Sequence, residues 1–185
     1  MSRGKMITMA DEVDSVEMMG RIQRMVIEAG REVLREETRD GDWLLYIKHG
    51  SYVITLTWPA GRRFMTVVFR GEISDEGLLK RLNDLFREPH RGGTLHFALV
   101  SALTYPNTFY DILKQGDSIT GFDVGALIFP FEERFSTLEL HVAIQSVVNA
   151  ALLGWAFIGS VLGLSDLEEH LKEGSIRTSP EGMFA

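Results

Sequence analysis

The sequence feature that most constrains the fold is a charge-free stretch near the C-terminal end of the chain. Residues 140–165 contain no Asp, Glu, Lys or Arg. A helix start precedes them, because the hydroxyl of Ser136 can bond the amide of Glu139 while the Glu139 side chain reaches back. A helix this apolar cannot stay in water. It must therefore be covered by lipid, by the core of the same chain or by a partner.

The length of this stretch meets the criterion for a membrane-spanning helix. Gly159 also opens a Gly-x-x-x-Gly motif of the kind that packs membrane helices. Against this, His141, Gln145 and Asn149 make one stripe polar. Both flanks are acidic, whereas spanning helices carry Lys or Arg on their cytoplasmic side. Membrane attachment through residues 140–164 is therefore the less favoured alternative.

Two protein environments stay open for a helix over residues 136–164. In the first, one face packs on a sheet and a second face packs on another copy of the chain, since two-fold dimers are the commonest oligomers. In the second, the helix is internal and is covered by residues 11–37 and 94–104. We predict the homodimer, and the residues expected in its interface are Val148, Leu152, Trp155, Gly159 and Leu162.

Composition limits both the architecture and the compartment. A chain of 185 residues fits one domain, which we place at residues 11–172, between a disordered leader at 1–10 and a mobile tail at 173–185. The absence of Cys excludes disulfides, thiolate catalysis and Cys-based metal sites. A net charge of −7 argues against a nucleic-acid partner, because phosphate backbones are bound by clustered Lys and Arg. The leader lacks the apolar segment of a signal peptide, so we predict an acidic, cytoplasmic protein.

Hydrophobic periodicity predicts the remaining elements. Apolar residues spaced by three and four indicate a helix over 11–37, and a second helix, capped by Ser74, runs to Arg87. Residue alternation and short turns predict strands at 43–48, 52–58, 63–70, 108–113 and 121–129. The first three of these strands make an antiparallel meander. The segment 94–103 fits a helix or a strand, and we prefer a helix because its apolar residues share a face.

These elements predict an α+β fold, an antiparallel meander sheet flanked by helices in the order α-β-β-β-α-(α)-β-β-α. This order resembles the type III secretion chaperone-like fold and uncharacterised prokaryotic proteins that share it. The segments that carry the resemblance are Asp11–Glu37, Trp43–Arg70, Ser74–Arg87, Gly121–Phe129 and Ser136–Leu164. The resemblance implies a dimeric, non-enzymatic protein that holds an extended segment of a polypeptide partner against apolar surface.

No pattern in the sequence indicates catalysis. The histidines lack the spacing of metal ligands, and no serine lies in a Gly-x-Ser-x-Gly elbow. The adjacent acidic pairs at 36–37 and 132–133 point apart, so they are poor acid–base pairs. We therefore predict no catalytic residue, no metal and no cofactor, and we favour a chaperone-like or adaptor module that binds protein.

The first predicted helix is a candidate for partner binding. Methionines crowd this part of the chain, and Met adapts to varied partners, although the same spacing also suits ordinary core filling. We expect Val16, Met19 and Val26 to contact a partner.

A second candidate is the locally basic, glycine-bearing segment from Arg87 to Thr94. An alternative function, as a binder of small anions or metabolites or as an enzyme acting on them, would use Arg87, Arg91, Gly92 and Gly93 at a helix N-terminus. The segment lacks the Gly-Lys-Ser/Thr of a phosphate-binding loop, and a plain connection between helices would explain it equally well.

Overall fold

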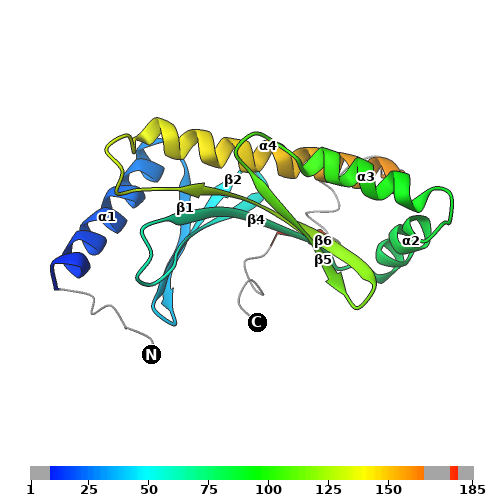
Figure 1. Ribbon diagram of the computed structural model, residues 1–185, viewed down its shortest axis with the longest axis horizontal. Coiled ribbons are helices and arrows are strands. Elements are labelled where there is room, and N and C mark those ends of the chain that lie inside the picture. The colour runs from blue at the N-terminus through cyan, green and yellow to red at the C-terminus, as the bar shows by residue number, and fades with distance from the viewer. Residues whose placement is uncertain (1–8, 165–175, 179–185) are drawn as a thin grey trace, which may run out of the picture.

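The computed structural model describes residues 9–164 and 176–178, with side chains from residue 16 onwards. It shows an α+β fold in which helices pack on an antiparallel sheet (Figure 1). The helices are α1 (Met9–Glu28), α2 (Glu76–Phe86), α3 (Gly92–Leu103) and α4 (Thr137–Leu162). The strands are β1 (Glu32–Arg39), β2 (Asp42–His49), β3 (Tyr52–Trp58), β4 (Met65–Ile73), β5 (Phe109–Gln115), β6 (Ser118–Ile128) and β7 (Ile176–Arg177).

The sheet has the strand order β1-β2-β3-β4-β6-β5, and β7 pairs with the end of β4. The hairpin of β5 and β6 therefore joins the first meander through β6, which lies beside β4 over eight residue pairs. Alternate residues of the central strands face the helices and are buried. One such row runs from Leu45 through Leu56 and Val67 to Ala126, each directly opposite the next.

Helix α4 covers the sheet along almost the whole length of the molecule (Figure 1). It begins at Ser136, whose hydroxyl accepts a hydrogen bond from the Glu139 amide at 3.3 Å. It ends at Gly163, which adopts the left-handed conformation with φ of 66°. The last carbonyls lack helical partners, and Arg81 of α2 donates to the Leu162 carbonyl at 2.6 Å. The predicted helix start and the long helix are confirmed.

Glycines let α4 approach the sheet closely. The Trp155 indole, which is fully buried, lies on Gly71 of β4, where an added Cβ would be 2.5 Å from a ring carbon. A Cβ at Gly154 would likewise be 2.5 Å from Leu103 of α3 and 2.8 Å from the Phe122 ring. The contacts of Trp155 and Phe122, whose ring centroids are 5.0 Å apart, depend on these bare backbone positions.

The predicted continuous helix over 11–37 is wrong, because the chain turns at Gly30 and residues 32–39 form β1. Gly30 takes a φ of 74°, and the Arg31 amide donates to the Val26 carbonyl to close the helix. Two acidic side chains of β1 accept hydrogen bonds from buried side chains of the neighbouring strand β2. Glu36 accepts from the Trp43 indole and Glu37 from the Tyr46 hydroxyl, both at 2.7 Å.

Several smaller expectations have clear outcomes. The preferred helix at 94–103 is confirmed as α3. The cap of α2 is Asp75 and not Ser74, since the Asp75 carboxylate accepts from the Leu78 amide at 2.8 Å. The expected leader lies outside the described residues except for the first two residues of α1. Within the expected mobile tail, the structure describes residues 176–178, of which Ile176–Arg177 form β7.

Filling the space at Gly71 should destabilise the fold. Gly71→Ala would push against an indole that has no room to move, so the free energy of unfolding should fall by about 1–3 kcal/mol. Gly93→Ala on α3, where nothing lies within 4 Å of the added carbon, is the matched control and should leave it unchanged or slightly higher. Urea denaturation of both variants measures this, and equal effects would contradict the packing described.

Candidate functional site

Exposed apolar side chains gather where β5 forms an edge of the sheet beside the end of β6. Phe109, Tyr110, Leu127 and Phe129 are 43%, 38%, 50% and 40% exposed, and we call them the β5 edge patch. Tyr110, the partner of the core residue Val124, lies on the opposite sheet face from Phe109. The Phe109 ring lies over Gly125, its partner on β6, where a Cβ would be 2.2 Å from the ring. Leu127 follows two residues later on the same face. An edge strand with large apolar side chains offers both backbone and side chains to a partner.

The two edges of the sheet differ in charge. The opposite edge, β1, is protected by ionic residues: Glu32 lies 3.5 Å from Lys48, and Glu37 pairs with Arg35. Strand β5 carries only Asp111 and Lys114 as charged residues. Charged side chains block strand pairing at an edge. Within the described residues, β5 is therefore the edge that remains suited to pairing.

A partly buried ion pair borders the β5 edge patch on the sheet face that bears Phe109 and Leu127. Arg70 of β4 donates to both carboxylate oxygens of Asp123 at 2.8 and 2.7 Å. This hydrogen bond raises the pKa of Arg70. Asp111 lies directly opposite Asp123 on β5 and is exposed. The exposed carboxylate of Asp111 therefore lies beside the β5 edge patch, on the same strand face as Phe109.

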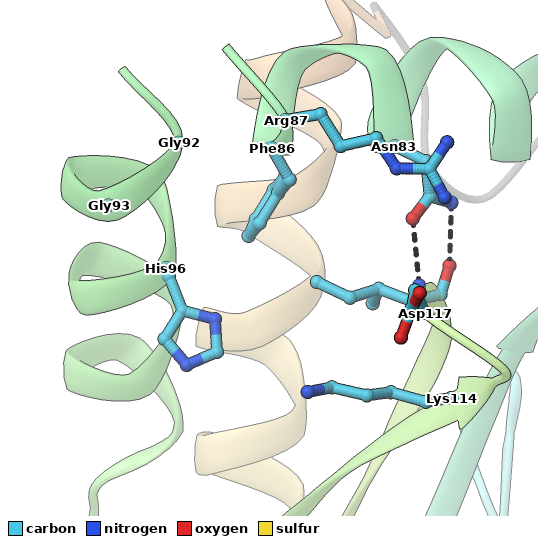
Figure 2. Close-up of a pocket in the computed structure, with 9 residues that line it drawn as sticks. Asn83, Phe86, Arg87, Gly92, Gly93, His96, Lys114 and Asp117 are labelled. Atoms are coloured by element: carbon cyan, nitrogen blue, oxygen red, sulfur yellow. Dashed lines mark hydrogen bonds between the residues drawn. The ribbon is translucent and has the colours of Figure 1, made fainter. Parts of the chain in front are cut away.

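The predicted anion segment lines a cavity of about 280 Å³ between α2, α3 and the β5–β6 turn (Figure 2). The lining residues are Asn83, Phe86, Arg87, Gly92, Gly93, His96, Lys114, Asp117 and Ile119. Arg87, Gly92 and Gly93 are thus brought together as expected, whereas Arg91 is exposed and does not line the cavity. Gly92 is needed there, because its Cβ would overlap the Phe86 carbonyl.

The walls of this cavity are fixed by one buried amide. The Asn83 side chain donates to the carbonyls of Leu79 and Ile119 and accepts from the Ile119 amide at 2.8 Å. Arg87 donates to the Ser118 hydroxyl at 3.1 Å. Lys114 and Asp117 carry opposite charges at the cavity, so its electrostatic preference for an anion is partly cancelled.

The three residues expected to bind a partner on α1 do not share a surface. Val16 is 66% exposed, Met19 is half-buried against the core, and Val26 is fully buried beside it. The helix turns its apolar stripe inward to cover the end of the sheet. Partner binding at Val16 stays a prediction, but Val26 belongs to the core.

Most of the residues expected at a dimer interface are also internal. Val148, Trp155, Gly159 and Leu162 are buried within their own chain, and only Leu152 is exposed. The most apolar face of α4 packs on the sheet, so a partner could contact only the opposite face. Dimerisation stays a prediction, but those four residues cannot form its surface.

Helix α4 passes the length and composition test for crossing a bilayer, and 56% of its most apolar window is buried within the protein. Membrane attachment therefore stays untested. Among the described residues, no group of His, Cys, Asp and Glu is placed to hold a metal ion.

A cluster of positive and titratable groups joins the turn between α1 and β1 to β2 and α4. The guanidinium of Arg31 lies 2.9 Å from Nδ1 of His141. A guanidinium can only donate, so Nδ1 of His141 is the acceptor in this contact. Burial, followed by the charges of Arg31 and His141, lowers the pKa of His49 below its ordinary 6.5.

No protein-family model and no curated protein sequence matches this chain. Among solved structures, the fold is similar to the crystal structure of an uncharacterised protein from Methanothermobacter thermautotrophicus, with a TM-score of 0.68 and 15% sequence identity. The match covers 79% of this chain and 99% of the other. At this identity the likeness shows the fold alone.

The sequence reasoning missed the β5 edge patch. The usable signal is the contrast between the charged sequence of β1 and the apolar start of β5. It becomes informative only when the strand order shows that these two strands are the edges.

The lowered pKa of His49 predicts that the folded chain loses stability in mild acid. Since the pKa of His49 is lower in the folded chain, the unfolded chain takes up the proton first as the pH falls through about 6.5. The free energy of unfolding should therefore decrease below that pH, and His49→Gln should reduce the decrease. His90→Gln, in the exposed turn before α3, is the control. Urea denaturation as a function of pH measures the slopes, and an unchanged slope for His49→Gln would refute the assignment.

Proposed function

We propose that this protein is a non-catalytic, chaperone-like or adaptor module that holds an extended segment of a partner polypeptide along β5. The observation that carries the proposal is that the two edge strands of the sheet differ in their charged and apolar side chains. One edge is covered with charges, and the other presents Phe109, Tyr110, Leu127 and Phe129. Addition of a strand to such an edge is a common way of binding peptides.

The physical basis is pairing by backbone and selection by side chains. An added strand would bond the outer N–H and C=O groups of β5, which gives affinity independent of sequence. Phe109, Asp111 and Leu113 alternate on one face of β5. A complementary segment would therefore carry apolar residues at alternate positions and Lys or Arg opposite Asp111, since opposite charges favour cross-strand pairs.

Two further observations support this role. The element order predicted from the sequence resembles the type III secretion chaperone-like fold, whose characterised members hold extended segments of partners. The chain is acidic, with a net charge of −7, which favours segments that contain basic residues. On the same grounds we propose a cytoplasmic location.

Selection from a random peptide library displayed on phage tests the proposal with the full chain as bait. Enriched peptides should show alternating apolar residues with Lys or Arg between them, and a synthetic copy should slow hydrogen exchange at the β5 amides. Leu127→Glu should weaken binding at least tenfold, because it places a charge within the apolar patch.

Ile27→Glu on α1 is the matched control, since Ile27 is 55% exposed and its helix packs on β1, at the opposite edge of the sheet from β5. It should bind the selected peptide as the unchanged chain does. Protection that maps to an element other than β5, or equal binding by Leu127→Glu, would refute the proposed site.

A second candidate function, anion or metabolite binding, is favoured by one observation: the Arg87–Thr94 segment lines a cavity. A phosphorylated ligand there should raise the thermal midpoint, because ligands stabilise the state that they bind. Arg87→Ala should abolish the shift, whereas Arg91→Ala, outside the cavity, should retain it. A thermal-shift screen with sugar phosphates and nucleotides measures this. No shift, or equal loss in both variants, would exclude the cavity as an anion site.

A further inference from the structure

We propose that the outward face of α4 binds the same face of a second copy of this chain, antiparallel and about a two-fold axis at Asn149. Apart from Asn149, the residues involved are Leu138, Val142, Gln145, Leu153, Ala156 and Ser160, which we call the outer stripe. All are exposed except Gln145, which is half-buried. Figure 1 shows α4 along the top of the molecule, with the sheet beneath it. This contact goes beyond the proposed peptide site and lies on the other layer of the fold.

The spacing of the outer stripe is symmetric about Asn149. Its positions, with Asn149 included, differ by 4, 3, 4, 4, 3 and 4 along the chain. Spacings of three and four keep side chains on one face of a helix. A two-fold axis at Asn149 therefore places each position of the stripe opposite another position of the stripe in the second copy.

The side chains are also complementary in size. The axis sets Leu138 opposite Ser160 and Val142 opposite Ala156, so that a larger side chain meets a small one at both of these pairs, while Gln145 lies opposite Leu153. Large residues near the start of the outer stripe and small ones near its end allow two antiparallel helices to interdigitate there. A flat bilayer or an unrelated partner would not require this arrangement.

Charge and hydrogen bonding also favour a second copy of the chain as the partner of the outer stripe. Two copies each carry a net charge of −7, and the outer stripe brings no Asp, Glu, Lys or Arg against its equivalent. The polar atoms at its centre are already paired within each copy: Gln145 donates to Asn149 at 3.0 Å, and Asn149 donates to the Tyr105 hydroxyl at 3.1 Å. Burial of these amides therefore leaves few unpaired groups.

The available area suits a modest dimer. A helix face spanning 22 residues is about 33 Å long and about 10 Å wide. Two such faces amount to about 660 Å², which is below the roughly 1,000 Å² of a stable specific interface and in the range of weak, transient ones. The dimer should therefore form at high protein concentration and dissociate on dilution.

Cysteine pairs test the register, because the natural chain contains no Cys. Val142→Cys and Ala156→Cys chains should form a disulfide-linked dimer when they are mixed and oxidised. Either variant alone should not, since 142 and its own equivalent lie about 21 Å apart along the antiparallel pair. Leu127→Cys, on the sheet, mixed with Ala156→Cys is the matched control and should not cross-link.

Sedimentation equilibrium supplies the second measurement. The natural chain should reach twice its 20.8 kDa mass, Ala156→Glu should weaken association at least tenfold, and Leu127→Glu should associate normally. A monomer at every concentration, or cross-linking that is equal in single variants and in the mixture, would overturn the proposal. Flotation of a monomeric chain with phosphatidylcholine vesicles would overturn it in favour of a lipid surface.

Discussion

The close packing of α4 on the sheet is the constraint on which the rest of this structure depends. Trp155 fills the space above Gly71, and Gly154 allows the helix to approach Phe122 and Leu103. Because Ile144, Trp155 and Ile158 are buried in the core, the inner face of the helix is fully used within the chain. Its outer face also lacks charged residues, and a second copy would cover the apolar surface exposed there.

The proposed surfaces lie on different layers and are compatible. Helix α4 offers a face for self-association above the sheet, whereas β5 offers an edge for an extended polypeptide. A dimer through α4 would present two β5 edges, and two linked sites can raise the avidity for a partner that carries two segments. The charges of β1 disfavour strand pairing at the other edge, which leaves β5 as the edge for the proposed strand addition.

The elements were predictable from sequence where local signals agree with the fold. The cap at Ser136, the meander from residue 43 and the helix α3 follow from periodicity and turn residues. Strand β1 was not predictable, because its acidic side chains are stabilised by donors on β2, and Val33 also fits the preceding helical pattern. The outer face of α4 was missed for a physical reason: in a helix that is apolar on all sides, hydrophobicity does not show which face the sheet will cover. The cavity at Arg87 was found through its local glycines, whereas the β5 edge patch required the strand order.

Hydrogen exchange of the α4 amides in detergent-free buffer tests the central claim most directly. If the sheet holds this helix by its inner face, the amides from residue 144 to residue 158 should exchange as slowly as those of β4 and β6, at the rate of global unfolding. Exchange of these amides in seconds while the strands stay protected, or a chain that remains soluble only in detergent, would contradict the account.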